Sequence, residues 1–313
     1  MKIVFLDAKT VGDIPEIKLL ERFGLLEVHE VTLQNNAMER CADADIIITN
    51  KVIIDRNIIE QSKYLKLICV AATGMNNIDL IAAEEHNVKV KNVKGYSTDS
   101  VAQHTFAMLF NLLHQITYYD QFVKSGAYSD NDIFTHLARE YYVLKDKVFG
   151  IIGLGSIGMR VAEIARVFGA EVVYHSTSGN NLDQPYRHYE LKELLAMSDI
   201  VSIHAPLNET TFNLLGYGEF AHMKRNAILI NTGRGGIVNE TDLAKALDDN
   251  LLFGAALDVF NTEPPAKDNP LLLVNENHRI LFTPHIAWAG KEARISLLQG
   301  ISNNIEEFIA SQN

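Results

Sequence analysis

The sequence predicts an α/β fold with two domains, each a parallel β-sheet with helices on its faces. The chain has 313 residues, about twice the common size of one domain. Short apolar runs rich in β-branched residues alternate with helical patterns, which is typical of parallel sheets. These runs fall into two series separated by one long helical pattern, so two sheets are more plausible than one very large sheet.

The first series of predicted strands occupies the N-terminal third of the chain. It starts in the segment MKIVFLDAKT, whose apolar run meets Asp7 too early for a signal peptide and fits a buried strand. The predicted strands of this series are Ile3–Leu6, Val28–Val31, Ile46–Thr49, Leu67–Ala71 and Val88–Val90.

The second series begins halfway along the chain and predicts the second sheet. Its apolar runs also have the length and composition of buried strands. These strands are Val148–Ile152, Glu171–Tyr174, Ile200–Ile203, Ala227–Ile230, Phe253–Leu257 and Arg279–Phe282.

Two helical patterns set the domain boundaries. Apolar residues keep helical spacing from Thr98 to Lys124 without Gly or Pro, which predicts one long helix between the two sheets. A second pattern, Glu292 to Ala310, follows the last strand, and we expect its helix to return to the first domain. The predicted domains are therefore residues 1–97 with 290–313, and residues 98–289.

Composition excludes several classes of function. A net charge of −11 without any basic run argues against nucleic-acid binding. No apolar stretch reaches the roughly 18 uncharged residues of a membrane span. Cys41 and Cys69 cannot form a disulfide framework and lack metal-ligand spacing, so we expect no metal site and a reducing compartment, the cytoplasm.

A glycine-rich loop predicts dinucleotide binding. Gly153, Gly155 and Gly158 follow the strand Val148–Ile152 and precede a helical pattern, Met159–Phe168. The glycines suit a tight turn, close approach of the backbone to a pyrophosphate, and close helix packing, while the helix N-terminus attracts the anion. The alternative is a tight strand–helix turn with no ligand.

The residues after the next strand leave the choice of cofactor open. A carboxylate that reads the ribose usually stands about 20 residues after the glycines. Here His175 directly follows the strand Glu171–Tyr174, and Ser176 comes next. No arginine that could bind a 2′-phosphate follows until Arg187. The sequence therefore predicts NAD(H) or NADP(H) without choosing between them.

Three ionisable residues follow strands of the second series, where an open parallel sheet binds its ligands. They are Arg234, Glu263 and His285. Arginine suits bidentate binding of a carboxylate, histidine suits proton transfer near neutral pH, and a carboxylate partner stabilises the imidazolium. These groups predict chemistry on a small 2-hydroxy acid. In the alternative, Arg234 only solvates a turn and Glu263 is a surface carboxylate.

Two further residues lie at strand ends. His204 ends the strand Ile200–Ile203, and we expect it to line the adenosine side of the site. Asp258 ends another strand and could bond a nicotinamide carboxamide; the alternative is a buried aspartate that organises a turn.

The chain resembles the D-isomer-specific 2-hydroxyacid dehydrogenase family along nearly its whole length. The resemblance rests on GLGSIG at 153–158, NTGRGGIV at 231–238, Asp258 with Glu263-Pro, and TPHIA at 283–287. It implies a Rossmann dinucleotide-binding domain, residues 98–289, and a smaller flavodoxin-like substrate domain that closes over a cleft. It also implies that Arg234 binds the substrate carboxylate, that His285 is the acid/base and that Glu263 is its partner.

The same resemblance implies further contacts. Backbone amides of the loop around Thr73, Gly74 and Met75 would bind the substrate carboxylate, and Thr105 would contact the cofactor. The remaining cofactor contacts that it implies are Ser156, Ile157, Ala205, Pro206, Thr232 and Gly233.

Within the family, the sequence looks most like the glycerate dehydrogenase and hydroxypyruvate reductase branch. Lys51 and Trp288 carry this likeness and would shape a pocket for hydroxypyruvate or glyoxylate, giving D-glycerate or glycolate; otherwise Trp288 only packs and Lys51 is solvated. The family also implies a homodimer. The alternative functions are an NAD(H)-sensing binding protein similar to corepressors, and a formate or phosphite dehydrogenase.

Overall fold

The computed structural model describes residues 1–275 and 277–312, and the chain forms two compact units. Unit 1 comprises Met1–Ser97 and Trp288–Asn313, and unit 2 comprises Thr98–Ala287. The second boundary lies two residues before the expected one. Trp288 belongs to unit 1 because it packs on the apolar core of that unit, with its ring edge against Tyr96 at a centroid distance of 6.3 Å.

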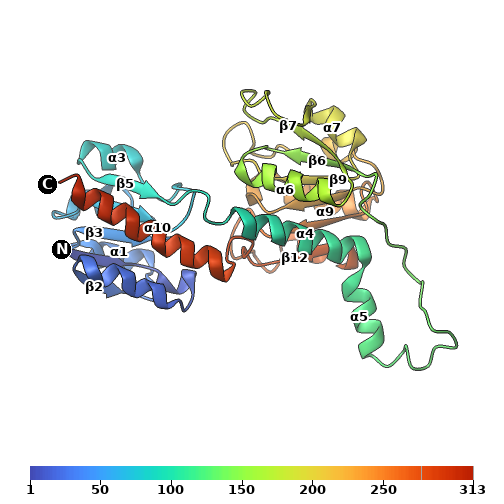
Figure 1. Cartoon of the computed structure of the whole chain (residues 1–313), viewed down its shortest axis with the longest axis horizontal. Helices are drawn as coiled ribbons and strands as arrows, with labels where there is room; N and C mark the ends of the chain where they lie inside the picture. The colour runs from blue at the N-terminus through green and yellow to red at the C-terminus, as the bar shows by residue number, and fades with distance from the viewer. Residues whose placement is uncertain (276, 313) are drawn as a thin grey trace. The chain divides into compact units, whose positions relative to one another are not determined.

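Unit 1 is a five-stranded parallel sheet between two layers of helices (Figure 1). Its strand order, β2-β1-β3-β4-β5, is the doubly wound order of flavodoxin-like domains. Both faces of β1 (Lys2–Phe5) are buried, because Ile3 and Phe5 pack with the C-terminal helix α10 (Lys291–Ala310), while Val4 and the next residue, Leu6, pack with helices on the other face. The strands are β1 Lys2–Phe5, β2 Leu25–Val28, β3 Ile46–Thr49, β4 Leu67–Val70 and β5 Lys89–Asn92, and the helices are η1 Ala8–Val11, η2 Pro15–Phe23, α1 Gln34–Cys41, α2 Arg56–Gln61, α3 Leu80–Glu85 and α10 Lys291–Ala310.

Unit 2 is a seven-stranded parallel sheet in the order β12-β11-β10-β9-β6-β7-β8. Helices α4 and α6 pack on one face, and α7, α8 and α9 pack on the other. The strands are β6 Val148–Ile152, β7 Glu171–His175, β8 Arg187–His188, β9 Ile200–Ile203, β10 Ile228–Asn231, β11 Gly254–Leu257 and β12 Ile280–Phe282. The helices are α4 Thr98–His114, α5 Ile116–Lys124, α6 Ser156–Val167, α7 Leu191–Met197, α8 Tyr217–Phe220, α9 Glu240–Asp248, η3 Gly235–Ile237, η4 Pro270–Leu273 and η5 Asn277–Arg279.

The order of strands in unit 2 creates a reversal point beside β6. The chain proceeds from β6 to β7 and β8 on one side, and β9 to β12 lie on the other side. Ligands of open α/β sheets bind outside the carboxyl ends of strands at such a point. The two-domain α/β prediction is therefore confirmed, and the fold places the glycine loop after β6 at the reversal.

The prediction of one helix from Thr98 to Lys124 was wrong. Gln115 adopts a left-handed backbone with φ 52° and ψ 39°, which ends α4 and starts α5. Its side-chain amide donates to the carbonyl of Leu112 at 2.7 Å and its amide oxygen accepts from Arg139 at 3.0 Å. These contacts offset the cost of the left-handed conformation at Gln115. Nothing in the local sequence predicts that conformation.

Several element boundaries also differ from the expected ones. The second strand is Leu25–Val28 rather than Val28–Val31, because Leu25 and Val28 pair with Lys2 and Phe5 of β1. The short edge strand β8 was missed, and α6 starts at Ser156 rather than Met159.

Within residues 1–275 and 277–312, none of the helices combines the length and apolar character that crossing a bilayer requires. The same residues contain no group of three or more His, Cys, Asp or Glu side chains that could hold a metal ion. Cys41 and Cys69 are free and buried, and burial raises the pKa of both thiols to about 12.

Candidate active site

Two of the three loop glycines are required by the local backbone. Gly153 has φ +91°, and an added Cβ would lie 2.7 Å from Cα of Ala205. An added Cβ at Gly158 would collide with the carbonyl oxygen of Gly153. A side chain at either position would therefore push the loop after β6 away from β9 or from its own helix.

Gly155 differs because no described atom lies within 4 Å of the place that its Cβ would take. It is the N-cap of the 12-residue helix α6, and it offers no side chain to bond the first N–H groups. Those N–H groups, from Ser156 and Ile157 onward, lie at the positive end of the helix dipole. Open space beside a helix N-terminus fits the pyrophosphate of a dinucleotide.

The end of β7 carries neither a carboxylate nor an arginine that would select a cofactor. His175 Nδ1 lies 3.1 Å from the carbonyl oxygen of Tyr189, and its ring stacks on His188. Ser176 is buried beside it. Asn181 then fastens this segment to the glycine loop, since its amide donates to the Leu154 carbonyl at 2.7 Å.

His204 continues β9 toward the glycine loop, with Ala205 and Pro206 after it. Its Nε2 lies 2.8 Å from the hydroxyl of Ser202. Among the described residues, its buried Nδ1 has no hydrogen-bond partner. Burial lowers the pKa of this imidazole to about 3, so the ring is neutral at physiological pH.

Glu263 and His285 form a close pair. Nδ1 of His285 lies 2.6 Å from Oε2 of Glu263, and Oε1 of Glu263 accepts from the backbone N–H of Phe260 at 3.1 Å. The side chains are 22% and 32% exposed for His285 and Glu263 respectively, so both are accessible to a ligand. Because Nδ1 faces the carboxylate, Nε2 is left for proton transfer.

Arg234 follows β10 in a loop that Asn231 organises. The Asn231 amide donates to the carbonyl of Arg234 at 2.8 Å, and its oxygen accepts from the N–H of Gly233 at 3.0 Å. A Cβ at Gly235 would collide with the backbone of Phe260. The loop with Arg234 therefore touches the loop that ends in Glu263, and the three predicted groups follow the adjacent strands β10, β11 and β12.

Asp258 organises the turn that carries His285. Its carboxylate is 1% exposed and accepts from the backbone N–H groups of Ile286 and Ala287, both at 2.8 Å. The geometry matches the alternative of a buried turn aspartate. A bond from Asp258 to a nicotinamide carboxamide stays a prediction.

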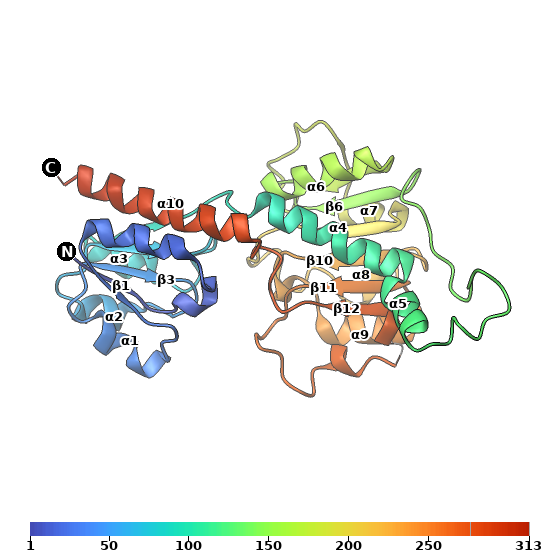
Figure 2. The same cartoon turned by 60° about the horizontal axis from the view of Figure 1, so that its bottom comes forward.

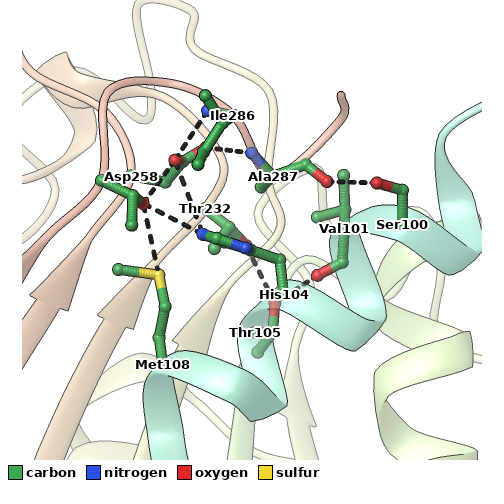
Figure 3. A network of polar contacts seen from close by, with 10 residues as sticks. Ser100, Val101, His104, Thr105, Met108, Thr232, Asp258, Ile286 and Ala287 are labelled. Atoms are coloured by element: carbon green, nitrogen blue, oxygen red, sulfur yellow. Dashed lines mark hydrogen bonds and ion pairs between the residues drawn. The ribbon is translucent and has the colours of Figure 1, made fainter. Parts of the chain in front are cut away.

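Thr105 is fully buried on α4. Its hydroxyl donates to the carbonyl of Val101 at 2.8 Å and lies 3.1 Å from the hydroxyl of Thr232 (Figure 3). The hydroxyl thus supports the loop of Thr232 and Gly233, and a contact of Thr105 with the cofactor stays a prediction.

The remaining predicted substrate residues, Lys51, Thr73, Gly74, Met75 and Trp288, lie in unit 1. Lys51 has an exposed side chain, and its backbone N–H donates to the buried carboxylate of Asp7 at 2.6 Å. The Thr73 hydroxyl donates to the Val93 carbonyl at 3.1 Å. Met75 packs partly buried on an apolar cluster.

Sequence reasoning missed two residues next to this site. Nε2 of His104 lies 3.0 Å from the hydroxyl of Thr283, two residues before His285. A signal was present, because Ser100, His104 and Met108 repeat every fourth residue on one face of α4. Only the tertiary structure shows that this face meets the turn after β12.

Residues 106–287 match the family model described as D-isomer specific 2-hydroxyacid dehydrogenase, NAD binding domain. The chain belongs to this family. The resemblance inferred from the motifs is confirmed, and the protein is an oxidoreductase with a nicotinamide cofactor.

Relatives of known activity match the chain along almost their whole length. A hydroxypyruvate reductase of Blautia hydrogenotrophica is 35% identical, covering 99% of this chain and 97% of the relative. A glycerate dehydrogenase of Methylorubrum extorquens is 33% identical with the same coverage. An acyclic imino acid reductase, Bsp5, solved in complex with NADPH and D-Arg, is 31% identical and superposes with a TM-score of 0.88 over 99% of this chain and 98% of that chain.

Gly153 and Gly155 differ in their surroundings, so we expect a change to alanine to have different effects at the two positions. We expect Gly155→Ala to leave the unfolding midpoint within about 2 °C and to weaken NADH and NADPH binding at least about tenfold, or about 1.4 kcal/mol, because its Cβ enters only open space. Gly153→Ala is the matched control that should lower the midpoint. Fluorescence titration and thermal unfolding measure both effects, and unchanged cofactor affinity in Gly155→Ala would contradict the assignment of this space to the pyrophosphate.

Proposed function

We propose that the protein interconverts a small 2-keto acid and the corresponding D-2-hydroxy acid, with Arg234, Glu263 and His285 as its catalytic residues. The observation that carries the proposal is the 2.6 Å contact of Glu263 with Nδ1 of His285 on a loop packed against that of Arg234. The family and the names of its relatives support the same reaction class.

Arg234 binds the substrate carboxylate in this proposal. Its guanidinium is always charged and presents two parallel N–H donors, which match the two oxygens of a carboxylate. One Nη1 donor is bonded to the carbonyl of Gly233 at 2.8 Å, which orients the guanidinium. Binding at one end of the substrate leaves C2 to face His285.

His285 holds and moves the proton of the reaction. In the direction of reduction, its Nε2–H donates to the oxygen on C2; in oxidation, neutral Nε2 accepts the proton of the hydroxyl. Glu263 keeps the ring oriented through Nδ1–H and stabilises the imidazolium by its charge. Gly155 and the N-terminus of α6 would hold the pyrophosphate of the dinucleotide, whose nicotinamide would supply the hydride in reduction and accept it in oxidation.

Removal of the imidazole tests the assignment of the proton carrier. We expect His285→Ala to bind NADH as the wild type does and to lose about 10²–10⁴-fold in kcat, the usual contribution of a positioned acid/base. Glu263→Gln keeps a hydrogen-bonding group but removes the charge, so the acidic limb of the kcat/KM profile for oxidation of the hydroxy acid should move to lower pH. Wild-type turnover in His285→Ala, or an upward shift in Glu263→Gln, would refute these roles.

The proposed physiological substrate is hydroxypyruvate, with glyoxylate as a smaller alternative. Relatives named hydroxypyruvate reductase and glycerate dehydrogenase support this choice. Lys51 supplies a charged donor for an oxygen on C3, and its backbone is fixed by Asp7. Trp288 contributes less to this argument, because its ring packs with Tyr96 in the core of unit 1.

Substrate preference follows from the extra oxygen on C3. We expect hydroxypyruvate to exceed pyruvate in kcat/KM by at least about tenfold, since a hydrogen bond to a charged group contributes about 1.5–3 kcal/mol. Lys51→Met should remove most of that ratio, whereas Lys63→Met, an exposed lysine elsewhere in unit 1, should keep it. Parity in the wild type, or a preference for branched keto acids, would exclude the glycerate-type substrate and leave the dehydrogenase chemistry intact.

We also propose a homodimer, supported by an apolar arm on unit 2. Helix α5 and the chain after it, residues 116–143, extend away from the sheet and helices of unit 2 (Figures 1 and 2). Contiguous apolar exposure of this kind marks an interaction surface. Its exposed large apolar side chains are Ile116, Val123, Tyr128, Ile133, Phe134, Leu137, Tyr141, Tyr142 and Val143.

The arm gives a test of the oligomeric state. We expect the wild type to sediment as a dimer at micromolar concentration and Phe134→Asp with Leu137→Asp to sediment as a monomer, since the two side chains are 90% and 76% exposed in the single chain. Ile81→Asp, a change at a 68% exposed position of unit 1, is the control and should remain dimeric. A monomeric wild type, or a dimeric arm variant, would argue against this surface.

A further inference from the structure

A network of polar contacts joins helix α4 to the turn that carries His285 (Figure 3). Nε2 of His104 lies 3.0 Å from the hydroxyl of Thr283 and 3.8 Å from Oδ1 of Asp258. The Thr283 hydroxyl donates to Oδ1 of Asp258 at 2.6 Å. At the other end of the turn, the hydroxyl of Ser100 donates to the carbonyl of Ala287 at 2.6 Å.

The number of available protons fixes the direction of these bonds. An ionised carboxylate only accepts hydrogen bonds, and a threonine hydroxyl has one proton to give. Thr283 gives its proton to Asp258, because a charge-assisted bond at 2.6 Å is stronger than a bond to Nε2 of His104 at 3.0 Å or the contact with the sulfur of Met108 at 3.7 Å. His104 must then donate to Thr283, so its Nε2 carries a proton.

Through Asp258, these bonds reach the backbone around His285, the proposed proton carrier. His285 has φ +55°, a left-handed conformation that a residue with a side chain adopts only when its surroundings impose it. The carbonyl of Asp258 accepts from the N–H of His285 at 2.8 Å, and its carboxylate accepts from Ile286 and Ala287. One aspartate thus holds three consecutive backbone N–H groups.

We propose that His104 and Thr283 are positioning residues of the reaction, acting through Asp258 to hold His285 in its left-handed turn. Neither residue is expected to touch the substrate; their effect is to fix the Asp258 carboxylate in the orientation that reaches Ile286 and Ala287. This inference rests on the proposed role of His285 as the proton carrier.

Pairs of substitutions at Thr283 and His104 separate the loss of a hydrogen-bond donor from a change in the shape of the side chain. Thr283→Ser keeps the hydroxyl, and Thr283→Val keeps the volume without it. His104→Gln keeps an N–H donor near the position of Nε2, whereas His104→Leu removes it. Thr241→Val is the matched control, because Thr241 is exposed on α9 away from this network.

We expect Thr283→Val and His104→Leu to lower kcat about 10- to 100-fold, since a displacement of about 1 Å at a catalytic group can cost 10²-fold. The dissociation constant for NADH and the KM for the keto acid should stay within about twofold. Thr283→Ser and His104→Gln should recover most of the loss. In the Thr283→Val background, His104→Leu should add little, because both act through one chain of bonds.

Equal impairment of the Val and Ser variants, additive losses in the double variant, or cofactor affinity falling with kcat would overturn the inference and indicate general destabilisation. Wild-type kcat in Thr283→Val and His104→Leu would overturn it as well. If Thr283→Val fails to fold, the two His104 variants carry the test, since that side chain is 21% exposed. His285→Ala assayed in parallel separates the hypotheses: full activity there refutes the proposed function, whereas its inactivity beside an active Thr283→Val refutes only the network.

Discussion

The buried carboxylate of Asp258 is the contact on which the geometry of the active site depends. Asp258 is 1% exposed, and burying a carboxylate in this way costs free energy unless hydrogen-bond donors replace the water that would solvate it. Here backbone N–H groups and the Thr283 hydroxyl supply those donors, and the same bonds shape the turn after β12. Solvation of the charge and placement of His285 are therefore achieved by one set of contacts, and neither can change alone.

Parallel sheets explain why the other groups gather near this turn. Every strand of unit 2 points the same way, so the loops after β6, β9, β10, β11 and β12 emerge at one edge. The glycine loop and the three ionisable residues are far apart in sequence but follow strands of one sheet. Close backbone approaches at Gly153 and Gly235 then bring neighbouring loops into contact without side chains between them.

The sequence was informative where chemistry and local structure coincide. The positions of strand ends and the acid/base chemistry of the side chains sufficed to predict the pair of Glu263 with His285, because a parallel sheet leaves little freedom in where those loops emerge. The break at Gln115 could not be predicted, since its left-handed backbone is supported by Arg139, a residue distant in the chain. The same holds for His104 and for the burial of Thr105, which depend on the rotation of α4 against the sheet.

Unit 1 combines the N-terminal residues Met1–Ser97 with the C-terminal segment that contains α10. Ile3 and Phe5 lie on the sheet face that α10 covers through Leu297, Leu298 and Ile301. That helix leaves the ribosome only after all of unit 2, a delay on the order of ten seconds or more at about 5–20 residues per second. During this interval one apolar face of the nascent sheet lacks the helix that covers it, and such exposed apolar surface makes a partly synthesised chain prone to aggregation.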